Sequence, residues 1–220
     1  MGFLDALLGR SKPAQANLDR LFALPSAAID LDAVAGLRSS GRAGVCFKPA
    51  TGAVFAEIEA EVTAILDVHD DGGPGAPTPG TGPAAPSPAS ESPTSASGTP
   101  ASPDPAGWTR QTDQYGYEWI VLQADGLEDL VNRVHVVNAS LEDKGYGPQL
   151  LCSVFGLAGS DGRRCYLVYL YKRGTFYPFA PTGAENRDNE LELKLRSVVG
   201  EQLPMESDLS RWFPLWGLPV

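Results

Sequence analysis

The residues best suited to catalysis in this sequence are two histidines, three cysteines and one run of carboxylates. His69 has Asp70 and Asp71 beside it, and His135 has no histidine or cysteine three or four residues away. A zinc site needs such ligands to converge, so a histidine-based zinc site is not indicated. We interpret His69 as solvated, and His135 as a surface or hydrogen-bonded histidine of a helix.

The cysteines and carboxylates have structural interpretations. None of the cysteines belongs to a CxxC pair, and all lie in apolar stretches, which favours buried thiols in a reducing cytosol. The carboxylates stand where a helix is expected to begin, and acids there interact favourably with its positive end. These residues are Cys46, Cys152 and Cys165, and Glu185, Asp188, Glu190 and Glu192.

Sequence motifs of common enzymes are missing. GxSxG and GxxxxGK[ST] do not occur, and no GxGxxG follows an expected strand. The loop GSDGRR, at 159–164, is more simply a hairpin turn than an anion site. We therefore predict a protein that is not an enzyme, with no catalytic residue, no metal and no cofactor.

The most unusual feature is an apolar C-terminal stretch, RWFPLWGLPV, at 211–220. Exposed tryptophans invite aggregation, so we expect this tail to fold back over one end of a sheet and to offer its outer rim to a partner. The aromatic stretch 171–181 is interpreted as a strand end that caps the core, from which one tyrosine could face the same partner. The predicted partner-binding residues are Tyr177, Trp212, Phe213, Leu215 and Trp216.

The elements that must position these residues follow from the periodicity of residues 108–220. A hairpin is predicted over 108–124, turning near 113–116, with Trp119 and Val121 on one face. A helix over 126–144 follows, with capping-box spacing between Asp125 and Glu128. Strands over 150–157 and 165–172 and a helix over 189–203 complete the order ββ-α-ββ-α. This order predicts an α+β fold, a mainly antiparallel sheet flanked by helices.

The first 69 residues are predicted to be mostly helical. A helix around 18–22 is expected to end or kink at Pro25, and a short strand is expected at 45–47. Residues 53–66 fit both strand and helix periodicity, and their alanines and glutamates favour helix. A short amphipathic helix near the start carries Phe3, Leu4, Leu7 and Leu8, which are the candidate membrane-contact residues.

Residues 70–107 form the clearest boundary in the chain. They hold ten of the 19 prolines, no lysine or arginine, and no apolar side chain larger than alanine. Such a segment cannot bury enough surface to offset the entropy of ordering, so a disordered Pro/Ala/Ser-rich insertion is predicted. Residues 1–69 are marginal as an independent domain, and we expect them to pack on 108–220 as one folded unit.

Net charge and hydropathy limit the classes of partner and the cellular location that we expect for this protein. The net charge of −10 disfavours nucleic acid, which clustered lysines and arginines would bind. No apolar run approaches the length of a transmembrane helix, and the N-terminus lacks the pattern of a secretory signal. The expected location is the cytoplasm, with weak peripheral contact at the inner face of the cell membrane as an alternative.

Several stretches resemble one family. YLVYLYKRGTFYPFAP, the ending RDNELELKLRSVVGEQLPMESDLSRWFPLWGLP, and MGFLDALLGRSKP with NLDRLFALPSAAI are similar to PspAB, a protein associated with the phage-shock protein PspA in actinobacteria and some archaea. The resemblance implies an accessory adaptor in the envelope-stress response, with a PspA-like coiled-coil partner and a fold like the type III secretion chaperones. Two alternatives stay open: a peripheral membrane protein, or a chaperone-like or YbjN-like peptide-binding module.

Overall fold

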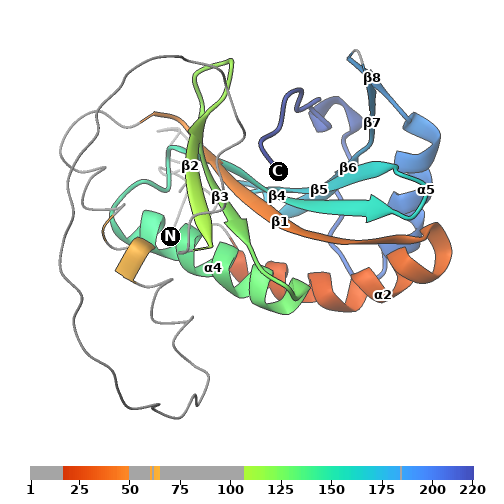
Figure 1. Ribbon diagram of the computed structural model, residues 1–220, viewed down its shortest axis with the longest axis horizontal. Coiled ribbons are helices and arrows are strands. Elements are labelled where there is room, and N and C mark those ends of the chain that lie inside the picture. The colour runs from red at the N-terminus through yellow and green to blue at the C-terminus, as the bar shows by residue number, and fades with distance from the viewer. Residues whose placement is uncertain (1–16, 50–59, 61, 65–106, 184) are drawn as a thin grey trace, which may run out of the picture.

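Six strands form one antiparallel sheet in the order β2-β3-β1-β4-β5-β6 (Figure 1). The computed structural model describes residues 17–49, 60, 62–64, 107–183 and 185–220. Its strands are β1 (Leu37–Phe47), β2 (Trp108–Thr112), β3 (Glu118–Gln123), β4 (Leu150–Gly159), β5 (Arg164–Leu170) and β6 (Thr175–Phe179), and a separate two-stranded ribbon pairs β7 (Pro181–Gly183) with β8 (Asn186–Arg187).

Helices cover one face of this sheet, and the C-terminal segment lies over the other (Figure 1). The helices are η1 (Leu18–Ala23), α2 (Leu24–Ala35), α4 (Leu127–Asp143) and α5 (Asn189–Val199), and a short η2 (Leu209–Arg211) lies in the C-terminal segment. Because strand side chains alternate between faces, the sheet contributes to two separate apolar clusters. The α+β prediction, with a mainly antiparallel sheet flanked by helices, is confirmed.

The larger cluster fills the space between the sheet and the helices. It joins Leu31 of α2, Val134 of α4 and Leu195 of α5 to Phe47 and Phe155 of the sheet, all fully buried. Burying side chains of this size stabilises the fold by about 1.5–3 kcal/mol each. Strand β1, from the first part of the sequence, lies between β3 and β4 at the centre of the sheet.

Several elements agree with the periodicity of the sequence. The hairpin of β2 and β3, helix α4, strand β4 and strand β5 lie where the pattern places them, and Trp119 and Val121 share one face. Gly145, with φ of 84°, follows the end of α4, as expected of a helix-terminating glycine. Among residues 53–66 the structure describes 60 and 62–64, which are helical, with Val62 buried.

Other details of the prediction are wrong. Gly126, not Asp125, is the N-cap of α4, and no side chain caps it. The helix η1 does end at Ala23, just before Pro25, but the prediction omits the helix that follows. Pro25 occupies the first turn of that helix, α2, where its missing N–H costs no hydrogen bond. β1 is longer than 45–47, α5 ends at Val199, and residues 175–179 form a strand of their own. β6 shows no alternation of apolar and polar residues, because four consecutive residues are buried: Phe176, Tyr177, Pro178 and Phe179.

Two predicted elements lie outside the described residues. They are the amphipathic helix with Phe3, Leu4, Leu7 and Leu8, and the insertion at 70–107 apart from Gly107. No helix in the described part of the chain combines the length and the apolar character that crossing a bilayer requires.

Candidate binding site under the C-terminal tail

The C-terminal tail, residues 204–220, is fixed first by main-chain hydrogen bonds to the edge strand β6. The N–H of Phe176 donates to the carbonyl oxygen of Pro204 at 2.9 Å, and the N–H of Glu206 donates to that of Phe176 at 2.7 Å. Met205 forms a parallel bridge with Phe176. The tail thereby satisfies part of an otherwise open sheet edge.

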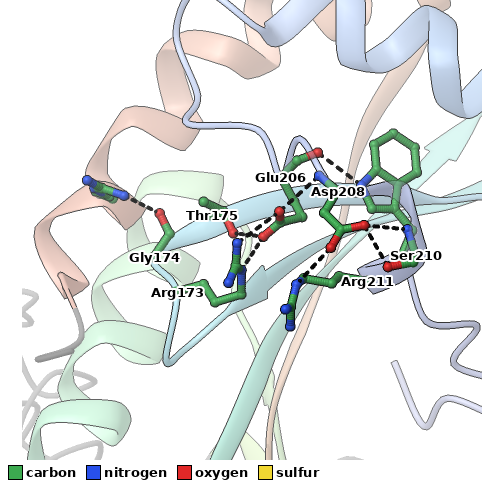
Figure 2. A network of polar contacts seen from close by, with 9 residues as sticks. Arg173, Gly174, Thr175, Glu206, Asp208, Ser210 and Arg211 are labelled. Carbon is green, nitrogen blue, oxygen red and sulfur yellow. Dashed lines mark hydrogen bonds and ion pairs between the residues drawn. The ribbon is translucent and has the colours of Figure 1, made fainter. Parts of the chain in front are cut away.

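A buried carboxylate makes the second attachment. The Glu206 side chain is 1% exposed, and its oxygens accept hydrogen bonds from the guanidinium of Arg173, from the Thr175 hydroxyl at 2.8 Å and from the Asp208 N–H at 3.1 Å (Figure 2). The Arg173 hydrogen bond is the main cause that lowers the pKa of Glu206 to about 2. This charged network ties the tail to the turn between β5 and β6.

Trp212 is the third attachment. Its side chain is 6% exposed, its indole N–H donates to the carbonyl oxygen of Glu206 at 3.1 Å, and its ring stacks on Tyr177 with 6.1 Å between centroids. Arg187 donates to the Trp212 carbonyl oxygen at 2.7 Å and pairs with the buried Glu192. Both the ring and the main-chain carbonyl of Trp212 are therefore fixed by contacts with other parts of the chain.

The last residues stay on the sheet. The Tyr177 hydroxyl donates to the carbonyl oxygen of Phe213 at 2.9 Å, and the Trp216 ring meets Phe179 edge-on at 5.1 Å. Arg42 donates to the carbonyl oxygen of Pro219 at 3.0 Å. The tail thus begins along the edge strand β6, and from Trp212 onward it packs on the face opposite the helices.

An apolar pocket of about 410 Å³ remains between this tail, the β2–β3 hairpin and the sheet. This size falls within the range of ligand sites. Asp113 lines it, but its carboxylate accepts hydrogen bonds from the Tyr115 and Tyr117 N–H groups and from the Trp119 indole N–H, each at 2.9 Å. The lining residues are Cys46, Asp113, Tyr115, Tyr117, Trp119, Leu151, Cys152, Leu170, Tyr177, Phe213, Pro214, Leu215, Trp216, Gly217 and Leu218.

Comparison with known protein families identifies the family of this chain. The profile of PspAB, PspA associated protein B, matches residues 1–76 and 101–220. The chain belongs to the PspAB family. The unmatched residues of this PspAB chain, 77–100, fall within the proline-rich stretch. The chain matches no curated protein and no solved structure, so its likeness to type III secretion chaperones stays a prediction.

The structure of this PspAB chain brings most of the predicted partner-binding residues together. Tyr177, Phe213, Leu215 and Trp216 all line the pocket, whereas Trp212 lies outside it. Their role in binding a partner stays a prediction.

Sequence reasoning did not assign the hairpin tyrosines or the two cysteines to this site. Tyr115, Tyr117 and Trp119 alternate along the hairpin, which was the available signal for a shared face. The pocket location of Cys46 and Cys152 depends on strand pairing, which a single sequence does not display.

The groups considered first for chemistry have structural partners. The ring of His135 packs on Phe22 at 4.9 Å, and Asp188 caps α5 by accepting the Leu191 N–H at 2.9 Å. Glu190 and Glu192 lie in the first turn of α5, as predicted, but Glu192 is 2% exposed and paired with Arg187. Within the described residues, no three histidine, cysteine or acidic side chains converge as metal ligands would.

Proposed function

We propose that this chain is a non-enzymatic accessory protein that binds a PspA-like protein through the pocket under its C-terminal tail. The family name associates PspAB with PspA, and the pocket is the feature that supports a binding mode. We place this activity in the cytoplasm. The observation that carries the proposal is an aromatic pocket bordered by exposed rings and built partly from the tail.

Exposure of the lining supports binding of another protein. Phe213 is 56% exposed, Tyr115 is 58% exposed and Tyr117 is 37% exposed, although all three are large and apolar or aromatic. Aromatic side chains held on a rigid base are typical anchors of protein interfaces. These three rings border a pocket whose sheet side is formed by buried residues, so an inserted side chain would be desolvated.

The polar groups of the pocket support recognition by shape. The Tyr177 hydroxyl and the Asp113 carboxylate are hydrogen-bonded within the chain, and burial raises the pKa of Tyr177 well above its ordinary value. Neither group is presented to a ligand as an acid or a base. A PspA-like coiled coil would offer an amphipathic helix, whose apolar residues at i, i+3 and i+4 fit such a pocket.

Isothermal titration of a PspA-like coiled-coil protein into the full chain and into single variants tests the proposal. Phe213→Ala should weaken binding about 10-fold or more, as loss of an interface anchor does. Ile29→Ala is the matched control, because Ile29 is 71% exposed on α2, far from the pocket lining. Equal affinities of the two variants, or no binding by the unaltered chain, would contradict the proposal.

A further inference from the structure

Two cysteines face each other across the centre of the sheet. Cys46 of β1 is directly opposite Cys152 of β4 in the antiparallel register. Both belong to the apolar cluster on the tail side, so their side chains leave the sheet on the same face. Their thiols are free.

This register supplies the geometry that a disulfide needs. Opposed residues of an antiparallel pair have Cα atoms about 4.5–5.5 Å apart, and a disulfide spans about 4.4–6.8 Å between Cα atoms. The common face also aligns the two Cβ atoms. The register shifts between Cys46 and Phe47, immediately after the pair. Such an irregularity bends the strand locally and changes the direction of neighbouring side chains.

An oxidant can reach this pair. Cys46 and Cys152 are only 4% and 7% exposed, but both line the pocket under the tail. Its volume of about 410 Å³ far exceeds the roughly 30 Å³ that one water molecule occupies in the liquid. Because exposed residues such as Phe213 also line it, a molecule hardly larger than water can enter from the surface.

We propose that Cys46 and Cys152 are a redox modification site, at which a hydroperoxide forms a reversible cross-strand disulfide at the base of the pocket. This inference goes beyond the proposed function and does not depend on it. The third cysteine provides an internal comparison: Cys165 is fully buried, belongs to the helix-side cluster and is opposite Leu157.

The reaction balances with one hydrogen peroxide molecule. One sulfur, as its thiolate, attacks a peroxide oxygen; the O–O bond breaks, and the hydroxide released takes up the thiol proton and leaves as water. The second sulfur then attacks the sulfenic sulfur. The S–O bond breaks, the S–S bond forms, and a second water leaves with the second thiol proton. The two thiols lose two electrons, and the peroxide gains them.

The environment of the pair favours slow, selective oxidation. The neighbouring Cys152 thiol and then burial raise the pKa of Cys46 far above its ordinary value. Cys46 therefore stays a thiol at neutral pH, which keeps its reaction with peroxide slow. Burial raises the pKa of Cys165 to about 12, and no thiol faces it across the strands, so sulfenic acid formed there would have no resolving partner.

Mass spectrometry of the full chain tests this proposal. After treatment with hydrogen peroxide, the folded protein should lose the mass of two hydrogen atoms, and alkylation after denaturation should label Cys165 alone. Peptide mapping should find Cys46 linked to Cys152, and dithiothreitol should restore all three thiols. Three labelled cysteines, a link that includes Cys165, or a disulfide between two molecules would overturn the proposal.

Two variants sharpen the result. Cys165→Ser should form the disulfide as the unaltered chain does, whereas Cys152→Ser should show no loss of hydrogen. A loss of two hydrogen atoms in Cys152→Ser would overturn the assignment. If Cys152→Ser does not fold, as far-UV circular dichroism would report, the peptide map of the unaltered chain still decides the question.

Discussion

Replacing Trp212 by alanine should test whether the tail is part of the folded body. The indole is 6% exposed, stacks on Tyr177 at 6.1 Å and donates a hydrogen bond to Glu206. Truncation of a buried tryptophan to alanine typically costs about 3–5 kcal/mol, from lost burial and from the cavity left behind. We expect the free energy of unfolding to fall by about 3–5 kcal/mol.

Urea denaturation followed by far-UV circular dichroism measures this change, since the signal does not depend on the removed indole. Phe213→Ala is the matched control: the neighbouring ring is 56% exposed, so its loss should cost below about 1 kcal/mol. Hydrogen exchange adds a local readout, because the Glu206 N–H bonded to Phe176 should lose protection when the tail detaches. Equal stabilities of the two variants would refute the reasoning that Trp212 fixes the tail.

Three further predictions concern the network, the insertion and the N-terminus. The pKa of Glu206 is lowered to about 2, so its contribution to stability is present above its unfolded pKa near 4.5 and is lost as pH falls toward 2. Glu206→Gln should lower the free energy of unfolding at pH 7 by about 1–2 kcal/mol, a figure discounted because Arg173 is half-exposed. In urea denaturation the variant should also show a flatter dependence of stability on pH. Protease cleavage within 70–107 should leave two fragments that co-elute in gel filtration, because β1 lies between β3 and β4, and separate elution would contradict one folded unit. Deletion of residues 1–12 should reduce co-sedimentation with anionic liposomes if Phe3, Leu4, Leu7 and Leu8 contact a membrane; unchanged sedimentation would remove that alternative.

Local patterns predicted a large part of the fold. Helix α4 shows a continuous apolar stripe from Leu130 to Leu141, and the β2–β3 hairpin has a turn that Gly116 completes with φ of 80°. Both depend on neighbours within a few residues, so periodicity alone identifies them. Strand β6 was missed because four consecutive residues are buried and leave no alternation. The first part of β1 was missed for the opposite reason: it is polar and partly exposed, and its register shifts between Ser39 and Ala43.

Of the candidate site, the sequence predicted residues of the tail and Tyr177 of β6, but not the hairpin or the two cysteines. The apolar character of Trp212, Phe213 and Trp216 required that the tail be covered, whatever the fold. Which residues complete the pocket depends on the hairpin and on the sheet. Tyr115 and Cys152 are distant in the sequence, and only the pairing of β3 with β1 and of β1 with β4 brings them to one cavity.

The sequence by itself determined the apolar stripes, the compositional break at 70–107, the absence of common enzyme motifs, and a tail too apolar to remain in water. Tertiary structure alone decided that Glu206 is paired with Arg173 and that Cys46 is opposite Cys152. The physical reason is the separation along the sequence of the residues that interact. Side-chain periodicity is fixed by the backbone geometry of one element, whereas a charge pair or a strand register depends on which distant elements share a core.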